Sequence, residues 1–153
     1  MARKIDLTVI IPCFNEQYTI SNVITKVLLN ARLFLINVEI IAIDDGSSDG
    51  TKKEIFKHAK KFKNIIFIEH EKNLGFGAAY KSGIKKARGK FSVLIPGDDE
   101  ANVKDTLSLF HNTRNVDMVI PFVVNVYARN IFRRFTSVLF VIIINISFFQ
   151  FVR

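Results

Sequence analysis

The chain has 153 residues, a length typical of one domain. Hydrophobic residues make up 49% and charged residues 24%, a globular composition that excludes an intrinsically disordered chain. Lysine and arginine total 22 against 14 acidic residues, and the net charge of +8 fits a phosphorylated substrate, an anionic membrane surface or solubility alone. No basic run alternates with base-stacking aromatic residues, so we expect no nucleic-acid binding. The single cysteine, Cys13, excludes an internal disulfide framework and favours a reducing compartment.

Short apolar runs rich in β-branched residues alternate with stretches of helical period along the first 120 residues. The predicted strands are 7–13, 38–43, 64–70, 91–95 and 118–120, and the predicted helices are 18–30, 52–62, 76–88 and 103–110, the third with Gly89 as its C-cap. Many lysines lie between residues 52 and 90 at helical spacing, which favours a solvated helix face. The alternation predicts an α/β fold, with a mostly parallel sheet and helices on both faces. Ligands of such sheets bind beyond the carboxyl ends of the strands, where four polar clusters lie.

The first cluster, P-C-F-N-E, contains Pro12, Asn15 and Glu16 at the end of the first predicted strand. It has no glycine, whereas a dinucleotide site needs glycines at this turn so that pyrophosphate can approach the backbone. The cluster therefore argues against NAD or FAD. Alternatively, Asn15 caps the following helix and Glu16 favours its positive N-terminus.

The second cluster, D-D-G-S-S-D-G-T, begins with two adjacent carboxylates, Asp44 and Asp45, at the end of the second predicted strand. Two neighbouring carboxylates repel each other unless something binds there. A carboxylate can accept hydrogen bonds from the N–H of a nucleobase, from backbone amides or from hydroxyls. The simpler alternative is a turn in which Asp49 is the N-cap of the next helix.

The third cluster, N-L-G-F-G-A-A-Y-K-S-G, places Asn73, Gly75 and Gly77 between a strand and a helix. It resembles a glycine-rich phosphate loop only in part, because Tyr80 occupies the position of the third glycine. The alternative is a tight turn, followed by close packing of the helix at Gly83.

The fourth cluster, P-G-D-D-E, contains the consecutive carboxylates Asp98, Asp99 and Glu100 at the end of a strand. Carboxylate oxygens suit Mg²⁺ or Mn²⁺, which typically bind one or two carboxylates together with substrate phosphates. In an extended chain Asp98 and Glu100 would point the same way. The alternative is an acidic N-terminus of the helix that follows.

Residues 126–153 differ from the rest, because 135–152 carry no charge and follow Arg129, Arg133 and Arg134. Three interpretations stay open for 135–152: a marginal transmembrane helix, a helix in the membrane interface, and an ordinary core segment whose partners are missing. If the segment spans a membrane, the arginines favour its N-terminal side in the cytoplasm.

Taken in order, the four clusters resemble the family 2 glycosyltransferases with the GT-A fold. V-I-I-P-C-F-N-E is similar to the opening strand of that family, I-D-D-G-S-S-D-G-T to its signature, and N-L-G-F-G-A-A-Y-K-S-G with A-R-G-K to its next block. The branch that the chain resembles makes polyprenyl-phosphate (dolichol-phosphate-type) sugars. The resemblance implies that 1–125 form a domain that binds a nucleotide-diphospho-sugar. It implies that the nucleotide site comprises Pro12, Asn15, Glu16, Asp44, Asp45, Asn73, Gly75 and Gly77.

The family's metal motif, Asp-x-Asp with a following Gln, aligns with P-G-D-D-E. Pro96 replaces the first Asp, Asp98 matches the second, and Glu100 stands where the Gln would be. The resemblance implies Asp98 and Glu100 as ligands of Mg²⁺ or Mn²⁺, and we expect Asp98 and Asp99 to be catalytic.

The resemblance implies transfer of the sugar with inversion to a lipid phosphate or a glycan. A hydroxyl acceptor needs a general base, which we do not find after residue 101, whereas a lipid phosphate is already anionic. We expect Arg129, Arg133 and Arg134 to hold that phosphate at the cytoplasmic face of a membrane. Family members usually continue further, so we hypothesise a shortened chain; the alternative to an enzyme is a non-catalytic remnant that binds nucleotide-sugar or a partner protein.

Overall fold

The computed structural model describes residues 4–119, 138–139, 141–142 and 145. The chain divides into two compact units, Met1–Asp117 and Met118–Arg153. In the second unit Val138, Leu139, Val141, Ile142 and Asn145 are helical. No helix among the described residues is both long enough and apolar enough to cross a bilayer. The other residues of 135–152, and the three arginines that precede that segment, lie outside the described part of the chain.

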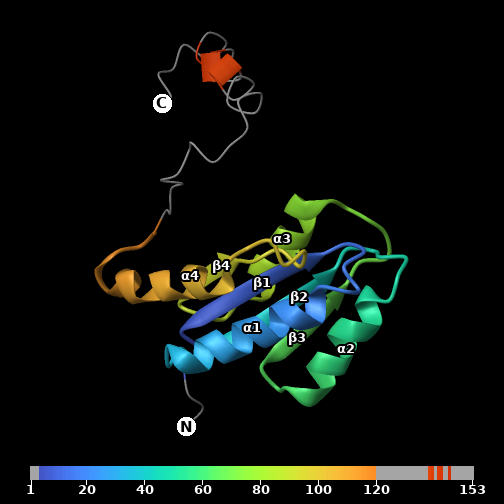
Figure 1. The fold of residues 1–153 in the computed structure, drawn as a ribbon, viewed down its shortest axis with the longest axis horizontal. Coiled ribbons are helices and arrows are strands. Elements are labelled where there is room, and N and C mark those ends of the chain that lie inside the picture. The colour runs from blue at the N-terminus through green and yellow to red at the C-terminus, as the bar shows by residue number, and fades with distance from the viewer. Residues whose placement is uncertain (1–3, 120–137, 140, 143–144, 146–153) are drawn as a thin grey trace. The chain divides into compact units, whose positions relative to one another are not determined.

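The first unit is built on a parallel sheet whose strands follow the order β3-β2-β1-β4 (Figure 1). Its strands are β1 (Leu7–Cys13), β2 (Val38–Asp44), β3 (Ile65–Glu69) and β4 (Phe91–Leu94). Its helices are α1 (Ile20–Leu33), α2 (Thr51–Lys61), α3 (Phe76–Lys86) and α4 (Val103–Ser108), followed by the 3₁₀ helix η1 (Leu109–Asn115). The strand order reverses between β1 and β4, and ligands of open α/β sheets bind at such a point.

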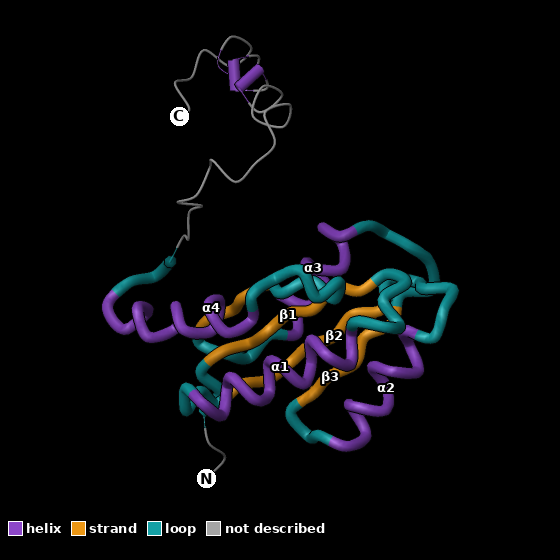
Figure 2. Tube along the Cα trace, viewed as in Figure 1, coloured by secondary structure: helices purple, strands orange, loops and turns teal. Residues whose placement is uncertain are grey.

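Alternate residues of the central strands pack on opposite faces of the sheet. Val9 and Ile11 of β1 belong to the larger core, with residues of α1, α2 and α4. Ile10 belongs to the smaller core, with Ile41 of β2 and Ala79 of α3. Helices α1, α2 and α4 thus cover one face and α3 the other, as Figure 2 shows. The predicted α/β fold with helices on both faces is confirmed.

The remaining differences from the sequence prediction lie at element ends. Helix α1 begins at Ile20, two residues later than expected, and the described residues of the expected strand at 118–120 are not in a strand. Gly89 is not a C-cap, because α3 ends at Lys86 and the cap residue Ala87 is extended. A Cβ on Gly89 would lie 2.5 Å from the backbone N of Thr8, so this glycine is needed for a close approach to β1.

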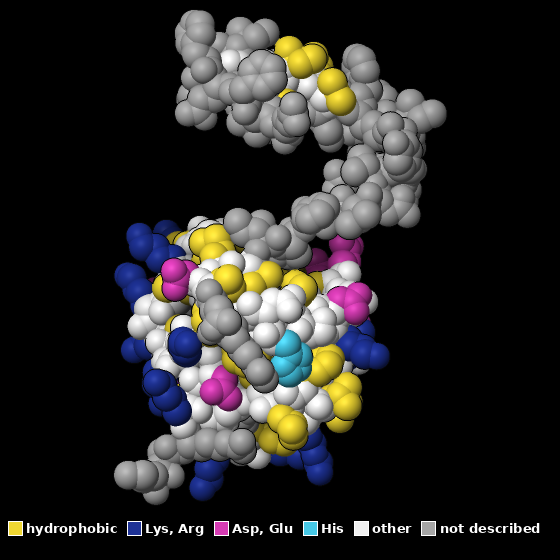
Figure 3. Space-filling view, turned by 90° about the vertical axis from the view of Figure 1, so that its left-hand side faces the viewer, with side chains coloured by type: hydrophobic (Ala, Val, Ile, Leu, Met, Phe, Trp, Pro, Cys, Tyr) yellow, Lys and Arg dark blue, Asp and Glu magenta, His cyan; other side chains and the backbone are white. Residues whose placement is uncertain are grey.

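Many of the basic residues of the described chain are exposed. The lysines of α2 and α3 are exposed, which confirms the predicted solvated helix faces. In the face shown in Figure 3, most Lys and Arg side chains lie on the left-hand side and at the lower edge, and a further group lies at the right-hand margin. On that face the positive charge is not concentrated in one patch.

An ion pair between the buried Glu39 and the exposed Arg88 ties the A-R-G-K segment to the amino-terminal edge of the sheet. Glu39 of β2 is 1% exposed and accepts hydrogen bonds from the Thr8 hydroxyl at 2.7 Å and from the backbone N and Nε of Arg88 at 2.6 and 2.9 Å. Burial would raise the pKa of Glu39, but the bonds from Thr8 and Arg88 outweigh it and lower the pKa. This segment therefore stabilises the fold at the end opposite the polar clusters.

Helix α3 lies against the sheet at Gly83, as the sequence suggested. A Cβ at this position would lie 2.5 Å from Cγ2 of Ile10 and 3.2 Å from Cδ1 of Ile43. A side chain here would have to push the helix away from both strands.

We expect Gly83→Ala to destabilise the fold by about 1–3 kcal/mol, the usual cost of overpacking a core. The matched control is Gly77→Ala in the same helix, where an added Cβ meets no atom within 4 Å. The control should be neutral or stabilising, by up to about 1 kcal/mol, because alanine favours a helix over glycine. Urea denaturation measures both values, and equal stability of the two variants would contradict the close packing at Gly83.

Candidate functional site

Hydrogen bonds join the loop after β1 to the loop after β2. The backbone N–H of Asn15, a residue with a φ of 58°, donates to the Ser47 hydroxyl at 2.9 Å. The Asn15 Oδ1 accepts from the Ser48 N–H at 2.9 Å, and the Glu16 N–H donates to the Thr51 hydroxyl at 2.7 Å. The alternative that Asn15 caps α1 is wrong, because its amide is used to hold the two loops together.

Asp49 also contributes to this loop junction. Its carboxylate accepts from the Thr51 N–H at 2.9 Å and from the Gln17 N–H at 3.2 Å. The N-cap of α2 is Gly50, so the expected N-cap role of Asp49 is wrong by one residue, although Asp49 does accept from the first N–H of the helix.

The two adjacent carboxylates at the end of β2 have different surroundings. Asp44 is buried, and its Oδ1 accepts from the Ser47 N–H at 3.1 Å, within the turn. The turn needs Gly46, which has a φ of 71° and whose Cβ would lie 2.4 Å from the carbonyl carbon of Lys72. The carboxylate of Asp44 thus holds a turn that lies against the loop after β3.

The Asp45 carboxylate organises the wall that precedes α3. Its Oδ1 accepts from Nδ1 of His70 at 2.7 Å and from the Leu74 N–H at 3.0 Å, and its Oδ2 accepts from the Gly75 N–H at 2.8 Å. Burial would raise the pKa of Asp45, but the bonds from His70, Leu74 and Gly75 outweigh it and lower the pKa. Asp45 is therefore an ionised acceptor that fixes the backbone at 74–75.

Sequence reasoning missed His70. Glu69 pairs with Asp44 in the register of β2 and β3, so the next residues, His70 and Asp45, lie side by side beyond the strand ends. His70 could have been identified from the sequence only by predicting the register of β2 and β3, which places His70 next to Asp45.

Gly75 is the N-cap of α3 and has a φ of 90°, a conformation that requires glycine. The turn that the sequence suggested at this point is confirmed. Gly77 lies within the first turn of α3, and its α-carbon faces open space.

The acidic cluster after β4 forms a turn rather than an extended chain. Asp99 has a φ of 65°, and its carboxylate accepts from the amine of Lys26 at 2.7 Å and from the amide of Asn22. The bond from Lys26 lowers the pKa of Asp99. The expectation that Asp98 and Glu100 share one side of an extended chain is wrong; the Glu100 N–H donates to Asp98 Oδ1 at 3.0 Å. Asp99 is thus bound to α1, whereas Asp98 faces a pocket.

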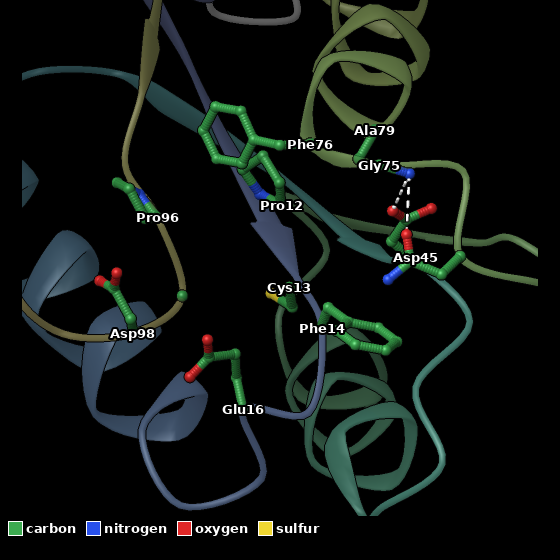
Figure 4. A pocket seen from close by; sticks show the side chains of 12 residues that line it. Pro12, Cys13, Phe14, Glu16, Asp45, Gly75, Phe76, Ala79, Pro96 and Asp98 are labelled. Carbon is green, nitrogen blue, oxygen red and sulfur yellow. Dashed lines mark hydrogen bonds between the residues drawn. The ribbon is translucent and has the colours of Figure 1, made fainter.

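That pocket has a volume of about 350 Å³ and lies at the reversal point between β1 and β4 (Figure 4). Its lining residues are Pro12, Cys13, Phe14, Glu16, Asp45, Asn73, Gly75, Phe76, Ala79, Pro96, Gly97 and Asp98. Asp45 and Asp98 thus share one pocket, with Asp45 beside Gly75 in Figure 4 and Asp98 on the same side as Glu16.

Part of the expected site lines this pocket. Pro12, Glu16, Asp45, Asn73, Gly75 and Asp98 are lining residues, whereas Asn15, Asp44, Gly77, Asp99 and Glu100 are not. The apolar and aromatic lining residues, chiefly Phe14, Phe76 and Ala79, were not predicted from the sequence.

The charge of the lining determines what can bind. Glu16, Asp45 and Asp98 line the pocket, and within the described part of the chain no lysine or arginine does. A diphosphate in this pocket would be repelled unless a cation lay between it and the carboxylates. Among the described residues no group of three or more His, Cys, Asp and Glu side chains could hold a metal. The residues fit Mg²⁺ or Mn²⁺ that takes the rest of its ligands from the substrate and water, the usual manner of Mg²⁺ sites at phosphates.

Cys13 does not add reactive chemistry to the pocket. Burial raises the pKa of its thiol well above the ordinary value, and the charges of Asp44 and Glu16 raise it further. The thiol is therefore neutral, and a neutral thiol is neither a nucleophile nor a metal ligand.

Comparison with known proteins finds relatives that include two enzymes named for lipid-phosphate sugars. The chain is 34% identical over 109 residues to a dolichyl-phosphate beta-glucosyltransferase of Dictyostelium discoideum, a match that covers 67% of this chain and 33% of the relative. It is 26% identical to a dodecaprenyl-phosphate galacturonate synthase of Rhizobium johnstonii, over 77% of this chain and 36% of that one. The chain thus spans about a third of the length of these relatives.

Solved structures give the same fold. S. aureus TarS in complex with UDP-GlcNAc is 28% identical, with a TM-score of 0.58 over 68% of this chain and 29% of that one. The Pyrobaculum calidifontis mannosyltransferase PcManGT, solved with GDP-Man and Mn²⁺, is 22% identical, with a TM-score of 0.57 over 70% of this chain and 31% of that one, and shows the fold alone. The family model described as glycosyl transferase family 2 matches residues 8–148. The chain has the GT-A fold and belongs to glycosyltransferase family 2.

Proposed function

We propose that the pocket binds a nucleotide-diphospho-sugar and that the protein transfers the sugar to a polyprenyl phosphate. The observation that carries this proposal is the meeting of Asp45 and Asp98 in one pocket at the reversal point of the sheet. UDP-GlcNAc binding by TarS, which shares the fold and 28% identity, supports the donor class. The names of the two lipid-phosphate relatives support the acceptor class.

The nucleoside end of the donor fits the side of the pocket formed by Phe14 and Asp45. Phe14 is 45% exposed, so its ring is accessible to a base, and base–aromatic stacking contributes about 1–3 kcal/mol per base. Asp45 Oδ2 accepts one hydrogen bond from Gly75 and has a second lone pair for a donor on the nucleoside.

The diphosphate fits the opposite side, between Asp98 and Glu16. Asp98 and Glu16, which lie on this side of the pocket, would hold Mg²⁺ or Mn²⁺. When bound, the cation neutralises the charge that develops on the diphosphate as it leaves. We keep Glu100 as a second candidate ligand. The turn that presents Asp98 is fixed by Asp99 and Lys26, so this carboxylate is oriented before the donor arrives.

The acceptor step needs no general base if the acceptor is a lipid phosphate. A phosphate oxygen of the acceptor attacks the anomeric carbon, the bond from that carbon to the diphosphate breaks, and the nucleoside diphosphate leaves from the opposite face with inversion. We propose that Arg129, Arg133 and Arg134, which lie outside the described residues, hold the acceptor phosphate at the cytoplasmic face of a membrane.

Thermal unfolding of the full chain with UDP, GDP and their sugars tests donor binding. A ligand that binds only the folded state raises the melting temperature by mass action. We expect such a rise for at least one nucleotide in the presence of Mn²⁺ and a much smaller one with EDTA. If none of the nucleotides raises the melting temperature, or if EDTA makes no difference, the proposed site is wrong.

A further inference from the structure

A chain of hydrogen bonds runs from α3 to Asp45 behind the wall of the pocket. The Ser82 hydroxyl lies 2.9 Å from Nε2 of His70, and Nδ1 of His70 lies 2.7 Å from Asp45 Oδ1. The side chains of His70 and Asp45 are 10% and 4% exposed, and His70 does not line the pocket. His70 thus acts on the pocket through Asp45 rather than on the ligand.

The partners determine the direction of both hydrogen bonds. The Asp45 carboxylate is ionised and can only accept, so Nδ1 of His70 must donate. In the neutral imidazole Nε2 then accepts from the Ser82 hydroxyl, and in the charged form Nε2 donates to the Ser82 oxygen. Asp45 therefore keeps its donor from His70 in either state of the ring.

The position of Asp45 in turn determines the backbone at the pocket wall. Its two oxygens accept from the N–H groups of Leu74 and Gly75, and Gly75 both lines the pocket and is the N-cap of α3. His70 also donates its backbone N–H to the Asp44 carbonyl at 2.9 Å, which holds the ring beside the end of β2. A carboxylate bound at three points, by the His70 ring and by two consecutive backbone N–H groups, has one orientation.

We propose that His70 is a positioning residue for the nucleotide site. Its Nδ1–H sets the orientation of Asp45, Ser82 sets the orientation of the ring, and Asp45 then keeps residues 73–75 in the conformation that accepts the nucleotide. The effect on nucleotide affinity rests on the proposed function, whereas the effect on the 74–75 backbone does not.

Three substitutions separate the contributions of the two ring nitrogens of His70. In His70→Asn the side-chain amide can take the place of Nδ1 and donate to Asp45, but it does not reach Ser82. In His70→Gln the amide takes the place of Nε2 and leaves Asp45 without this donor. His70→Phe replaces the imidazole with an apolar aromatic ring and loses both hydrogen bonds. Asn and Gln each retain one of the two bonds, so a purely structural role predicts similar behaviour for them.

The first measurement is the Kd of UDP and of GDP in the presence of Mn²⁺, by calorimetry on the full chain. We expect about a 10-fold rise in Kd for His70→Phe and His70→Gln, because the displaced pocket wall fits the nucleotide less well. In active sites a misplacement of about 1 Å can lower the reaction rate by about 100-fold. We expect His70→Asn to stay within about 3-fold of the native chain. Equal Kd values for the Asn and Gln variants, or native affinity in the Phe variant, would overturn the proposal.

The second measurement needs no nucleotide. We expect the amide hydrogens of Leu74 and Gly75 to exchange about 10-fold faster in His70→Gln than in His70→Asn, and the ¹⁵N spectrum of the native ring to show the proton on Nδ1. Unchanged exchange at Leu74 and Gly75, or a neutral ring protonated on Nε2, would overturn the positioning role even if nucleotides bind. If the exchange rates change but the native chain binds neither nucleotide, the donor site alone is wrong.

Discussion

Replacing Asp98 with alanine is expected to weaken the Mn²⁺-dependent binding of the nucleotide by at least about 100-fold. Residues that merely orient a metal ligand contribute about 10–100-fold to metal affinity or activity, so the loss of a ligand should cost more. Asp98 faces the pocket, whereas the carboxylate of its neighbour Asp99 is bound by Lys26. Calorimetric titration with Mn²⁺ present measures the loss, and sugar transfer should fall in parallel.

Glu71→Gln is the matched control, since it also removes one exposed negative charge but does not line the pocket. It should bind the nucleotide as the native chain does. Glu100→Gln tests the further candidate ligand, because a loss as large as that of Asp98→Ala would add Glu100 to the proposed ligands Asp98 and Glu16. If Asp98→Ala bound the nucleotide with native affinity, the acidic turn after β4 would not be the metal site.

Replacing Asp45 with asparagine is expected to destabilise the fold by about 2–4 kcal/mol and to abolish measurable nucleotide binding. The amide that replaces one oxygen would meet the N–H of Gly75 or the donor of His70, and a buried donor without an acceptor costs about 1–3 kcal/mol. The loss of the charge weakens the remaining hydrogen bonds as well, because hydrogen bonds to an ionised acceptor are stronger than those to a neutral one. Urea denaturation of the Asn variant measures the change in the free energy of unfolding.

The stability difference between the native chain and Asp45→Asn should depend on pH. The pKa of Asp45 is lowered in the folded state, so its contribution is complete above the ordinary aspartate value of about 3.9 and is lost as the pH falls through the lower, folded value. The difference should therefore be largest at neutral pH and shrink below about pH 4. Asp117→Asn, at an exposed position, should change stability by less than about 0.5 kcal/mol at any pH. A pH-independent difference for Asp45→Asn would contradict the ionised, buried acceptor.

The sheet could be predicted from the sequence because its signals are local. Strands β1 and β2 are buried along their whole length and mostly apolar, because buried parallel strands need side chains that pack on both faces. The clusters at the carboxyl ends of β1, β2 and β4 had to meet at one edge once the strands were parallel. The topology therefore predicted that the clusters holding Asp45 and Asp98 lie at one edge, and the resemblance to the family implied their roles in one site.

The different roles of neighbouring carboxylates could not be predicted, because each role depends on hydrogen-bond partners that are distant in the sequence. Asp99 is bound by Lys26, 73 positions away, and this bond turns a chain that was expected to be extended. Asp44 and Asp45 look alike in the sequence, yet one holds its own turn and the other the start of α3. Only the packing of α1 and the loop after β3 distinguishes these roles.

Paramagnetic broadening by Mn²⁺ tests most directly whether a metal and a diphosphate share this pocket. The measurement records amide NMR signals of the full chain during titration with Mn²⁺, with and without UDP or GDP. We expect the amides of Gly75, Gly97 and Asp98 to broaden first and at lower Mn²⁺ concentration when the nucleotide is present, while those of Glu39 and Arg88, at the other edge of the sheet, stay sharp. Broadening centred elsewhere, or unaffected by either nucleotide, would contradict a cation and a diphosphate held together in this pocket beside Asp98 and Glu16.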